Sequence, residues 1–429
     1  MPVTRFDQKV AKETLNPPTL EGRGWRFDRD LTPDCSSNST SARPVPALDS
    51  ASRAPHQDLT GEILDSKAMQ THLLAWEDLC TRSAEENVYY SPRYIRALLD
   101  HVERDHVDFA VIWNRSKIVA LLPFTRSKPA IPLLWPSRSA WKTKYNFNSV
   151  PLLDRELRAE AAEALLDLLG SVSNGEWIFP DANMQGEVAQ SLLKAMASKG
   201  VPSILTGSYF RAVLETGHTY EEHMRLNISK KRRKSLARNR RRLEELGEVE
   251  FESHTSGGQL KHAINIFLEI EMNGWKGQRG TALACSDGTR KFAMEAFSGE
   301  EAHSCGRADV LKLDGSPIAV SLAVLSGRTG FTVKCCYDES YSSYSPGLLL
   351  EVEVIRSFLS DKWADRLDSA TIEGHVIEGF WPGRIEIADI VFSLAPHNPR
   401  LRCAVLKRSI DARNFIRASA KKLLRRGGS

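Results

Sequence analysis

Residues 308–359 decide the fold that we expect of this chain, and they read ADVLKLDGSPIAVSLAVLSGRTGFTVKCCYDESYSSYSPGLLLEVEVIRSFL. Asp314-Gly315 marks a hairpin turn between two β-rich runs, and Gly330–Tyr337 adds a third run. Ser345-Pro346-Gly347 then opens an apolar helix, since serine is a good N-cap and proline suits the first helical position. The first backbone N–H groups of such a helix can bind an anion. The stretch predicts strands that lead into a loop and a helix, although an ordinary βα connection gives the same pattern.

The composition is that of a folded protein with room for two domains. The chain has 429 residues, of which 41% are hydrophobic and 26% charged, and its net charge is +4. No run approaches the ~20 apolar residues of a membrane span, and the first residues lack the apolar core of a signal peptide. The seven cysteines include no CxxC pair, which indicates reduced thiols rather than a metal site. We therefore expect a cytoplasmic protein without a metal.

A strand–turn–strand pattern occurs twice along the chain. Val107–Phe124 resembles Arg307–Ala323 when Asn114 is laid on Asp314, and a long helix follows each copy. Few residues are identical, so chance similarity is the alternative to a duplicated α/β unit. The first copy lacks the Ser-Pro-Gly loop before its helix. We therefore expect the second copy to bind a cofactor, and the first to be structural or to wall an acceptor cleft.

A basic helix is expected between the two halves. Between Lys230 and Arg242 there are nine basic residues and no acid, while Leu236 and Leu243 keep a narrow apolar face. Three interpretations stay open, namely a packed or solvated helix, an anion site that includes Arg232 and Arg233, and a nucleic-acid contact.

Five motifs in order resemble a known family. They are the basic helix Ser229–Leu246, Trp275-Lys276-Gly277, the hairpin around Asp314-Gly315, Tyr337-Asp338 and Tyr344-Ser345-Pro346-Gly347. This order resembles the GNAT superfamily, specifically the tandem-GNAT branch of CelD-like acetyltransferases of cellulose biosynthesis, with a more distant likeness to FemAB transferases. The resemblance covers roughly residues 70–400. The usual pyrophosphate loop of the superfamily is absent, and Tyr344–Leu348 would replace it.

The resemblance implies an α/β fold of two tandem GNAT-like domains, each a mixed, mostly antiparallel sheet flanked by helices. We expect a disordered segment over 1–65, the two domains over 66–215 and 216–403, and a basic amphipathic helix over 404–429. It also implies transfer of an acyl group from acyl-CoA, such as acetyl-CoA, to an amine acceptor, with a link to polysaccharide biosynthesis. Two alternatives remain. One is a FemAB-like transferase that uses aminoacyl-tRNA, and the other is a silent binding module of an exopolysaccharide system.

The expected chemistry requires a base, an oxyanion donor and a proton for the leaving thiolate. His375 is the candidate base because its unperturbed pKa is suitable, and Asp368 or Glu373 could orient it. Tyr341 or Tyr344 could protonate the thiolate. The residues expected at the donor are Thr332, Val333, Lys334, Ser345, Gly347, Leu348, Arg232 and Arg233, and those expected to wall the acceptor are Trp275 and Trp381.

The last segment, Val405–Arg426, carries eight basic residues and one acid on an amphipathic pattern. It predicts either a packed terminal helix or a surface for an acidic polymer or a membrane.

Overall fold

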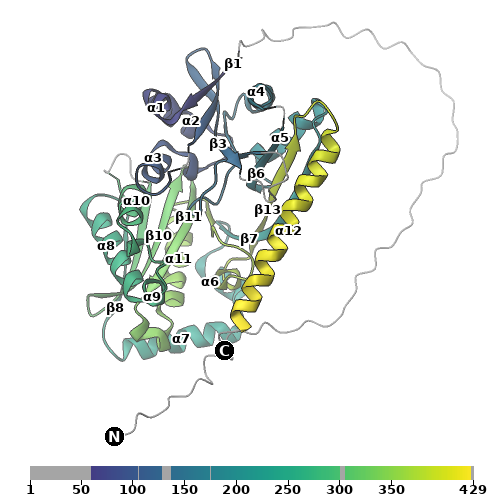
Figure 1. Ribbon diagram of the computed structural model, residues 1–429. Helices are drawn as coiled ribbons and strands as arrows, with labels where there is room; N and C mark the ends of the chain where they lie inside the picture. The colour runs from purple at the N-terminus through teal and green to yellow at the C-terminus, as the bar shows by residue number, and fades with distance from the viewer. Residues whose placement is uncertain (1–58, 105, 128–136, 174, 300–304, 427–429) are drawn as a thin grey trace, which may run out of the picture. The chain divides into compact units, whose positions relative to one another are not determined.

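The computed structural model describes residues 59–104, 106–127, 137–173, 175–299 and 305–426, and residues 57–429 form one compact unit (Figure 1). Strand β1 (Leu59–Asp65) begins inside the segment for which we expected disorder, and it pairs antiparallel with β2 (Asp108–Asn114). Residues 1–58 of that expected segment lie outside the described residues. In the described part of the chain, no helix is both long enough and apolar enough to cross a membrane.

The strands form one mixed sheet. Besides β1 and β2 they are β3 (Lys117–Ser127), β4 (Ser137–Ala140), β5 (Leu152–Leu153), β6 (Glu176–Asn183), β7 (Ser203–Glu215), β8 (Val249–His254), β9 (Gly306–Leu313), β10 (Ser316–Ser326), β11 (Thr329–Tyr337), β12 (Arg366–Asp368) and β13 (Gly383–Ser393). Their order in this 13-stranded sheet is β1-β2-β3-β4-β6-β13-β7-β12-β11-β10-β9-β8, and β5 pairs with β3. The β4/β6 and β11/β12 pairs are parallel, and the other pairs are antiparallel.

The helices flank this sheet. They are α1 (Ser66–Met69), α2 (Leu73–Arg82), α3 (Pro92–His101), α4 (Arg158–Val172), α5 (Glu187–Ser198), α6 (Tyr220–Asn227), α7 (Lys230–Glu244), α8 (Gly257–Asn273), α9 (Trp275–Gln278), α10 (Asp287–Phe297), α11 (Pro346–Asp361) and α12 (Pro399–Arg426). The 3-10 helices used below are η5 (Glu339–Tyr344) and η6 (Val376–Gly379). The predicted α/β fold with a mixed, mostly antiparallel sheet is confirmed.

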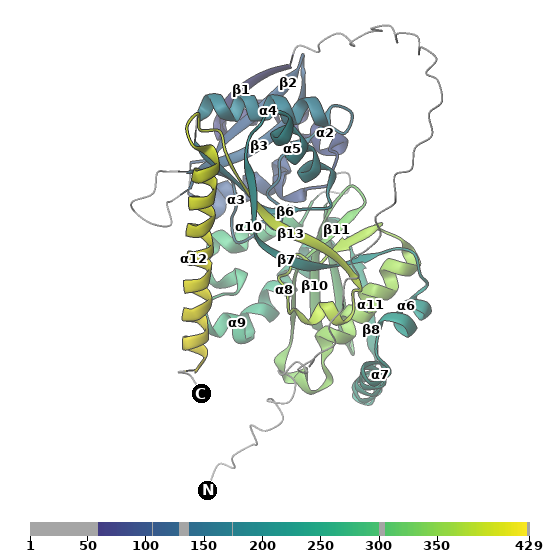
Figure 2. The same cartoon turned by 90° about the vertical axis from the view of Figure 1, so that its right-hand side faces the viewer.

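The two halves share the sheet through exchanged strands. β13, from the second half, lies between β6 and β7 of the first half (Figure 2). β7 in turn lies between β13 and β12. Separating the halves would therefore break backbone hydrogen bonds on both sides of β7 and β13. The expected boundary near residue 215 falls at the end of β7, a strand whose two neighbours both come from the second half.

The two hairpins are similar, but our alignment was wrong by one residue. Asn114 pairs with Lys117, and Leu313 pairs with Ser316, so Asn114 corresponds to Leu313 rather than to Asp314. In each hairpin the next residue has a positive φ, of 57° at Arg115 and 48° at Asp314. Because a two-residue turn of this kind needs left-handed backbone angles, backbone geometry fixes the register more reliably than residue identity.

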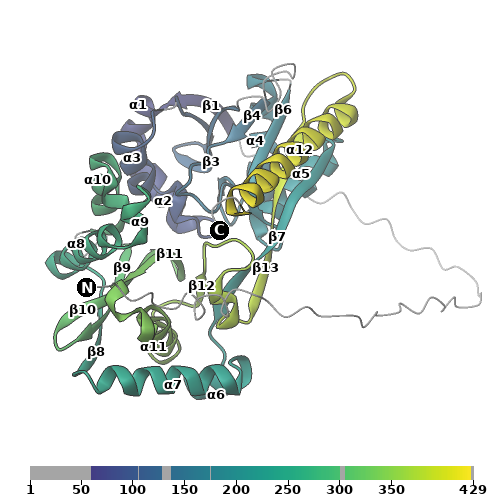
Figure 3. The same cartoon turned by 60° about the horizontal axis from the view of Figure 1, so that its bottom comes forward.

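Helix α12 packs against the sheet along its first part and is more exposed further on. It contacts β13 and β7 (Figure 3), where Ile410 is buried with Ile178 and Val391. Phe415 and Ile416 are exposed. The first part of α12 fits the interpretation as a packed terminal helix. The exposed part further on fits the interpretation as a surface for an acidic polymer or a membrane.

Candidate active site

A pocket of about 640 Å³ opens where β11, the start of α11 and the corner between α8 and α9 meet. Segment 369–380, which includes η6, forms its other side. The residues named from the sequence that line it are Trp275, Thr332, Val333, Lys334, Ser345, Gly347, Leu348 and His375. The structure therefore brings together much of the expected donor site.

Strand β11 supplies unpaired backbone on one wall of the pocket. Its parallel pairing with β12 ends at Phe331 opposite Asp368. On its other side β10 pairs Ala323 with Thr332 but Leu322 with Lys334, so Val333 is a bulge residue. Beyond Phe331 the β12 side of β11 has no strand partner among the described residues. Such an edge can bind the amides of an extended ligand or a developing oxyanion.

The start of α11 differs in detail from the prediction. Pro346 is at the first helical position, but Ser345 does not cap the helix with its side chain. Its backbone is left-handed (φ 56°), and its hydroxyl accepts a hydrogen bond from Asn239 Nδ2 of α7 at 3.3 Å. The carbonyl of Ser345 accepts the N–H groups of Leu348 and Leu349. Because proline has no N–H, Gly347 is the residue of this first turn whose N–H remains for a ligand.

A charged cluster forms the floor of the pocket. The fully buried Glu271 lies 3.0 Å from Lys276 Nζ and 3.3 Å from Lys334 Nζ, and it accepts the N–H of Leu283 at 2.8 Å. Burial alone would raise the pKa of Glu271, but the two lysines and the N–H hold it below its usual value. Burial in turn lowers the pKa of Lys334, against the opposing effect of Glu271. Sequence reasoning missed this cluster because Glu271 lies in the regular helix α8.

His375 lies on the exposed rim of the pocket. Its Nδ1 accepts the backbone N–H of Ile377 at 3.3 Å, so the neutral ring carries its proton on Nε2. Partial burial lowers the pKa of His375, and the nearby Glu378 opposes that shift. The carboxylate of Glu378 accepts hydrogen bonds from the backbone N–H groups of Gly374 and His375 in this turn.

The carboxylates expected to orient His375 have other surroundings. Asp368 is buried, its Oδ2 lies 3.4 Å from Arg211, and its Oδ1 accepts the N–H of Ala370 at 2.7 Å. Glu373 is exposed and does not line the pocket. Neither residue is hydrogen-bonded to His375 among the described contacts, so their expected roles stay predictions.

The remaining expected residues lie behind the pocket wall. Tyr341 and Tyr344 are half-buried against the core under α11, with the guanidinium of Arg242 4.9 Å from the Tyr344 ring. Trp381 is fully buried and donates from Nε1 to Glu351 Oε1 at 2.7 Å.

The two arginines of α7 do not line this pocket. Arg232 stacks on Phe380, itself a pocket residue, at 4.7 Å. Arg233 lines a separate groove between α6, α7 and α11.

Glu351 is a functional candidate that the sequence reasoning missed. It lines the pocket one turn after Gly347. The available signal was the pair of acids Glu351 and Glu353 inside the apolar run Leu348–Ile355.

Residues 230–371, from the first residue of α7 to just beyond β12, match the family described as Acetyltransferase (GNAT) domain. This stretch contains β11 and the whole of α11, and so most of the pocket. The match supports an acyltransferase. No curated protein matches the chain.

Several solved structures are similar to the chain at low identity. FemX shares 9% identity over 74% of this chain and 95% of its own, with a TM-score of 0.49. L-PGS from Bacillus licheniformis shares 10% over 79% and 96%, with a TM-score of 0.44. A tandem GNAT protein from the clavulanic acid biosynthesis pathway shares 11% over 79% and 100%, with a TM-score of 0.38.

Proposed function

We propose that this protein is an acyltransferase that moves an acyl group from acyl-CoA to an amine, and that its pocket holds the donor. The observation that carries the proposal is the unpaired, bulged edge of β11 from Thr332 to Cys335, in the wall of a pocket within the matched stretch. The pantetheine arm of CoA is extended and carries two amides. An unpaired strand edge is a suitable partner for such a chain.

The chain's own groups suit the reaction. The amine nitrogen attacks the thioester carbonyl, and backbone N–H groups of β11 are available to stabilise the oxyanion. Gly347, at the start of α11, offers an N–H and a favourable helix dipole to a phosphate of the donor. Lys276 and Lys334 share the single negative charge of Glu271, so this cluster keeps one net positive charge beside the donor.

The finer assignments rest on the sequence resemblance. They are acetyl-CoA as the donor, N-acetylation as the reaction, membership of the CelD-like branch, a polysaccharide link and a cytoplasmic location. We propose acetyl-CoA as the first donor to test because the matched family is described as acetyltransferases.

A second candidate uses aminoacyl-tRNA as donor, and the exposed face of α7 favours it. The exposed cations on that helix are Lys230, Lys231, Lys234, Arg238, Arg241 and Arg242. Such a row suits a phosphate backbone. The helix also packs on the protein through Leu236 and Leu243, so its buried face needs no ligand to explain it.

Thermal unfolding with acetyl-CoA, CoA or tRNA tests both candidates. A ligand at 100 times its Kd stabilises by about 2.7 kcal/mol, which should raise Tm by several degrees. Leu348→Trp should abolish the shift with acetyl-CoA because Leu348 lines the pocket. Leu401→Trp, at an exposed position of α12, is the matched control. A shift with tRNA alone would favour the second candidate, and no shift with any ligand would overturn both.

A further inference from the structure

A carboxyl group of the pocket is half-buried without a cation beside it. Glu351 lies on α11, where its neighbours Leu350 and Val352 are buried. Its carboxyl lines the pocket, yet among the described residues it forms no ion pair. A carboxylate in such surroundings loses hydration that nothing replaces by opposite charge.

Trp381 fixes the position of this carboxyl. The indole is fully buried, and its Nε1 donates to Glu351 Oε1 at 2.7 Å. An indole N–H can donate to a carboxylic acid as well as to a carboxylate, so the contact survives a change of protonation. Within the described residues, Oε2 of Glu351 has no hydrogen-bond partner. One oxygen is thus held and the other is left for a ligand.

The second acid of the pocket shows the contrast. Glu271 contacts two lysines and a backbone N–H, which keep it charged. Glu351 has only the indole N–H. Between the buried Glu271 and the half-buried Glu351, Glu351 is the acid that can exchange a proton near neutral pH.

We propose that Glu351 is the proton-transfer group of this pocket and that Trp381 is its positioning residue. The inference rests on the proposed function. As the amine nitrogen forms its bond to the carbonyl carbon, Glu351 Oε2 takes the proton that the nitrogen must lose. When the C–S bond breaks, the same oxygen gives that proton to the leaving thiolate. The products are an amide and free CoA thiol, and Glu351 returns to its carboxylate form.

Burial supports this role by raising the pKa of Glu351 to about 8, against the opposing effect of the Trp381 N–H. Two titratable groups face it from neighbouring strands. Asp309 on β9 raises the pKa further and is itself paired with Arg307 at 2.8 Å. Cys335 on β11 is exposed at the pocket, and loss of hydration raises the pKa of its thiol above the ordinary value, so it is uncharged near neutral pH. A base in this range is well matched to proton transfer at physiological pH.

Lys276, Lys334, Glu271 and His375 also line the pocket. The two lysines are already paired with Glu271, and the Nδ1 lone pair of His375 accepts a backbone N–H. Glu339 also lines the pocket, but it is exposed, and its Oε1 accepts the backbone N–H of Trp275 at 2.6 Å. Among the described residues, Glu351 is therefore the pocket carboxyl that is neither exposed nor paired with a cation.

The first test compares Glu351→Gln with Glu353→Gln in the full chain. Glu353 is the next acid on α11, but it pairs with Arg240 and Arg356 outside the pocket. The assay follows release of CoA thiol from acetyl-CoA with a panel of primary amines, and with water as the slow acceptor. Loss of a general base typically costs 10²–10⁴-fold in rate. Glu351→Gln should lose at least ~100-fold and keep the Tm shift with acetyl-CoA, while Glu353→Gln keeps both.

The pH profile separates proton transfer from a structural role. Wild-type kcat/KM should rise through an apparent pKa of about 8, and Glu351→Gln should remove this step. Trp381→Phe removes an N–H that favours the charged carboxylate, so the step should move to higher pH. Glu351→Asp should restore part of the rate.

A second measurement needs no acceptor. The 15N–1H resonance of the Trp381 indole, assigned with Trp381→Phe, should titrate near pH 8 in the wild type and stay constant in Glu351→Gln. An indole resonance that does not change between pH 6 and 9.5, or Glu351→Gln turnover within about threefold of the control, overturns the inference. Absence of any acetyl-CoA shift in the wild type would instead overturn the proposed function.

Discussion

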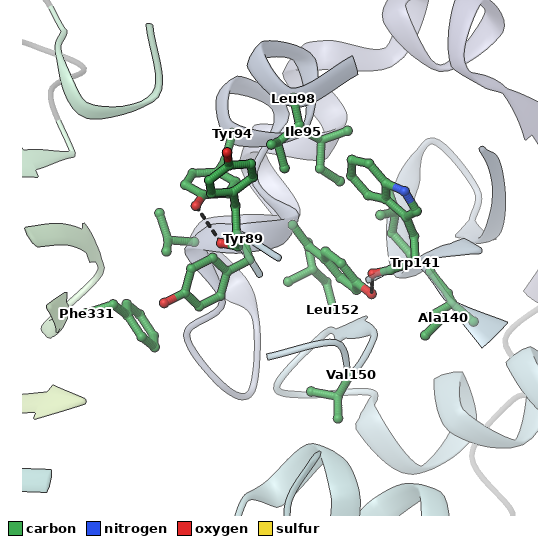
Figure 4. Packing of buried hydrophobic residues seen from close by; sticks show 14 of the residues in the cluster. Tyr89, Tyr94, Ile95, Leu98, Ala140, Trp141, Val150, Leu152 and Phe331 are labelled. Atoms are coloured by element: carbon green, nitrogen blue, oxygen red, sulfur yellow. Dashed lines mark hydrogen bonds between the residues drawn. The ribbon is translucent and has the colours of Figure 1, made fainter. Parts of the chain in front are cut away.

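Each half of the sheet contains a strand–turn–strand unit followed by a helix, but one unit borders a pocket and the other is filled with side chains. In the second half β10, β11 and α11 leave a pocket of about 640 Å³. In the first half, buried aromatic side chains gather between α3, β3 and the segment before α4 (Figure 4). Tyr90 donates to the carbonyl of Trp141 at 2.8 Å, and Tyr94 donates to that of Tyr145 at 2.7 Å. The same strand–turn–strand unit followed by a helix can thus be packed solid or left open, and the candidate site lies in the open copy.

The aromatic cluster also reaches across to the second half. Tyr89 packs edge-on against Phe331 of β11 at 5.2 Å, the residue at which β11 leaves β12 (Figure 4). The packed half therefore supports the base of the pocket wall. Whether the first half is structural or walls an acceptor cleft, as its missing Ser-Pro-Gly loop led us to expect, stays a prediction.

The largest expected effect on the free energy of unfolding comes from removing a buried aromatic side chain of the packed half. Trp141 is only 2% exposed, so Trp141→Ala should lower the free energy of unfolding by about 3–5 kcal/mol through lost burial and the cavity left behind. Trp275→Ala is the matched control because Trp275 lines the open pocket and is 47% exposed, so its loss should be well under half as large. Urea unfolding measures both. Equal losses would contradict the contrast between a packed and an open half.

Local sequence signals predicted the local structure well. Asp314-Gly315 gave the hairpin and Pro346 gave the start of α11, because turn and helix geometry depend on a few adjacent residues. The residues of β11 were expected at the donor because of the family resemblance, and the structure places Thr332, Val333 and Lys334 in the pocket lining, while their roles stay predictions. The left-handed Ser345 was not predicted, because its hydroxyl bonds to Asn239 of a distant helix rather than to its own.

Long-range features could not be read from the chain. The exchange of β7 and β13 depends on partners far apart in sequence, and many alternating strands satisfy the same local pattern. The choice of His375 relied on an unperturbed pKa, whereas the raised pKa of Glu351 depends on burial that only the fold creates. Asp368 was expected near His375, but its partner Arg211 comes from β7, which lies in the first half of the chain.

The second prediction concerns Glu85, a half-buried carboxyl of the packed half. Burial raises the pKa of Glu85 to about 7, against weak hydrogen bonds from Val188 and Asn183. The folded pKa lies above the unfolded value of 4.5, so the folded state binds the proton more tightly. Stability should therefore fall as pH rises from 4.5 to 7, by about 3 kcal/mol at 1.36 kcal/mol for each pKa unit.

Glu85→Gln should remove this loss, so the variant should be more stable than the wild type at pH 8 and similar at pH 4.5. Urea unfolding at the two pH values gives the difference, and any contribution from Glu351 is common to both proteins and cancels. Glu77→Gln, at an exposed position of α2, controls for the change of charge. An equal pH dependence in wild type and Glu85→Gln would mean that Glu85 is hydrated in the folded protein.

The smallest change in stability, and the sharpest contrast between the halves, should come from two glycines in corresponding helices. An added Cβ at Gly170 of α4 would meet its nearest neighbour, Leu394, at 4.0 Å, so Gly170→Ala should stabilise by about 0.4–1 kcal/mol. At Gly347 of α11 the Cβ would lie 3.3 Å from the Tyr337 ring, which offsets a similar gain. Both variants should therefore unfold within about 1 kcal/mol of the wild type. Gly347 also lines the pocket, and an added Cβ would stand beside its free N–H, where a donor phosphate is expected. The alanine keeps the N–H but obstructs access to it, so Gly347→Ala should lose most of the Tm shift with acetyl-CoA, while Gly170→Ala keeps it. If Gly347→Ala keeps the full shift, the donor does not approach the start of α11, and the open half would need another explanation for its pocket.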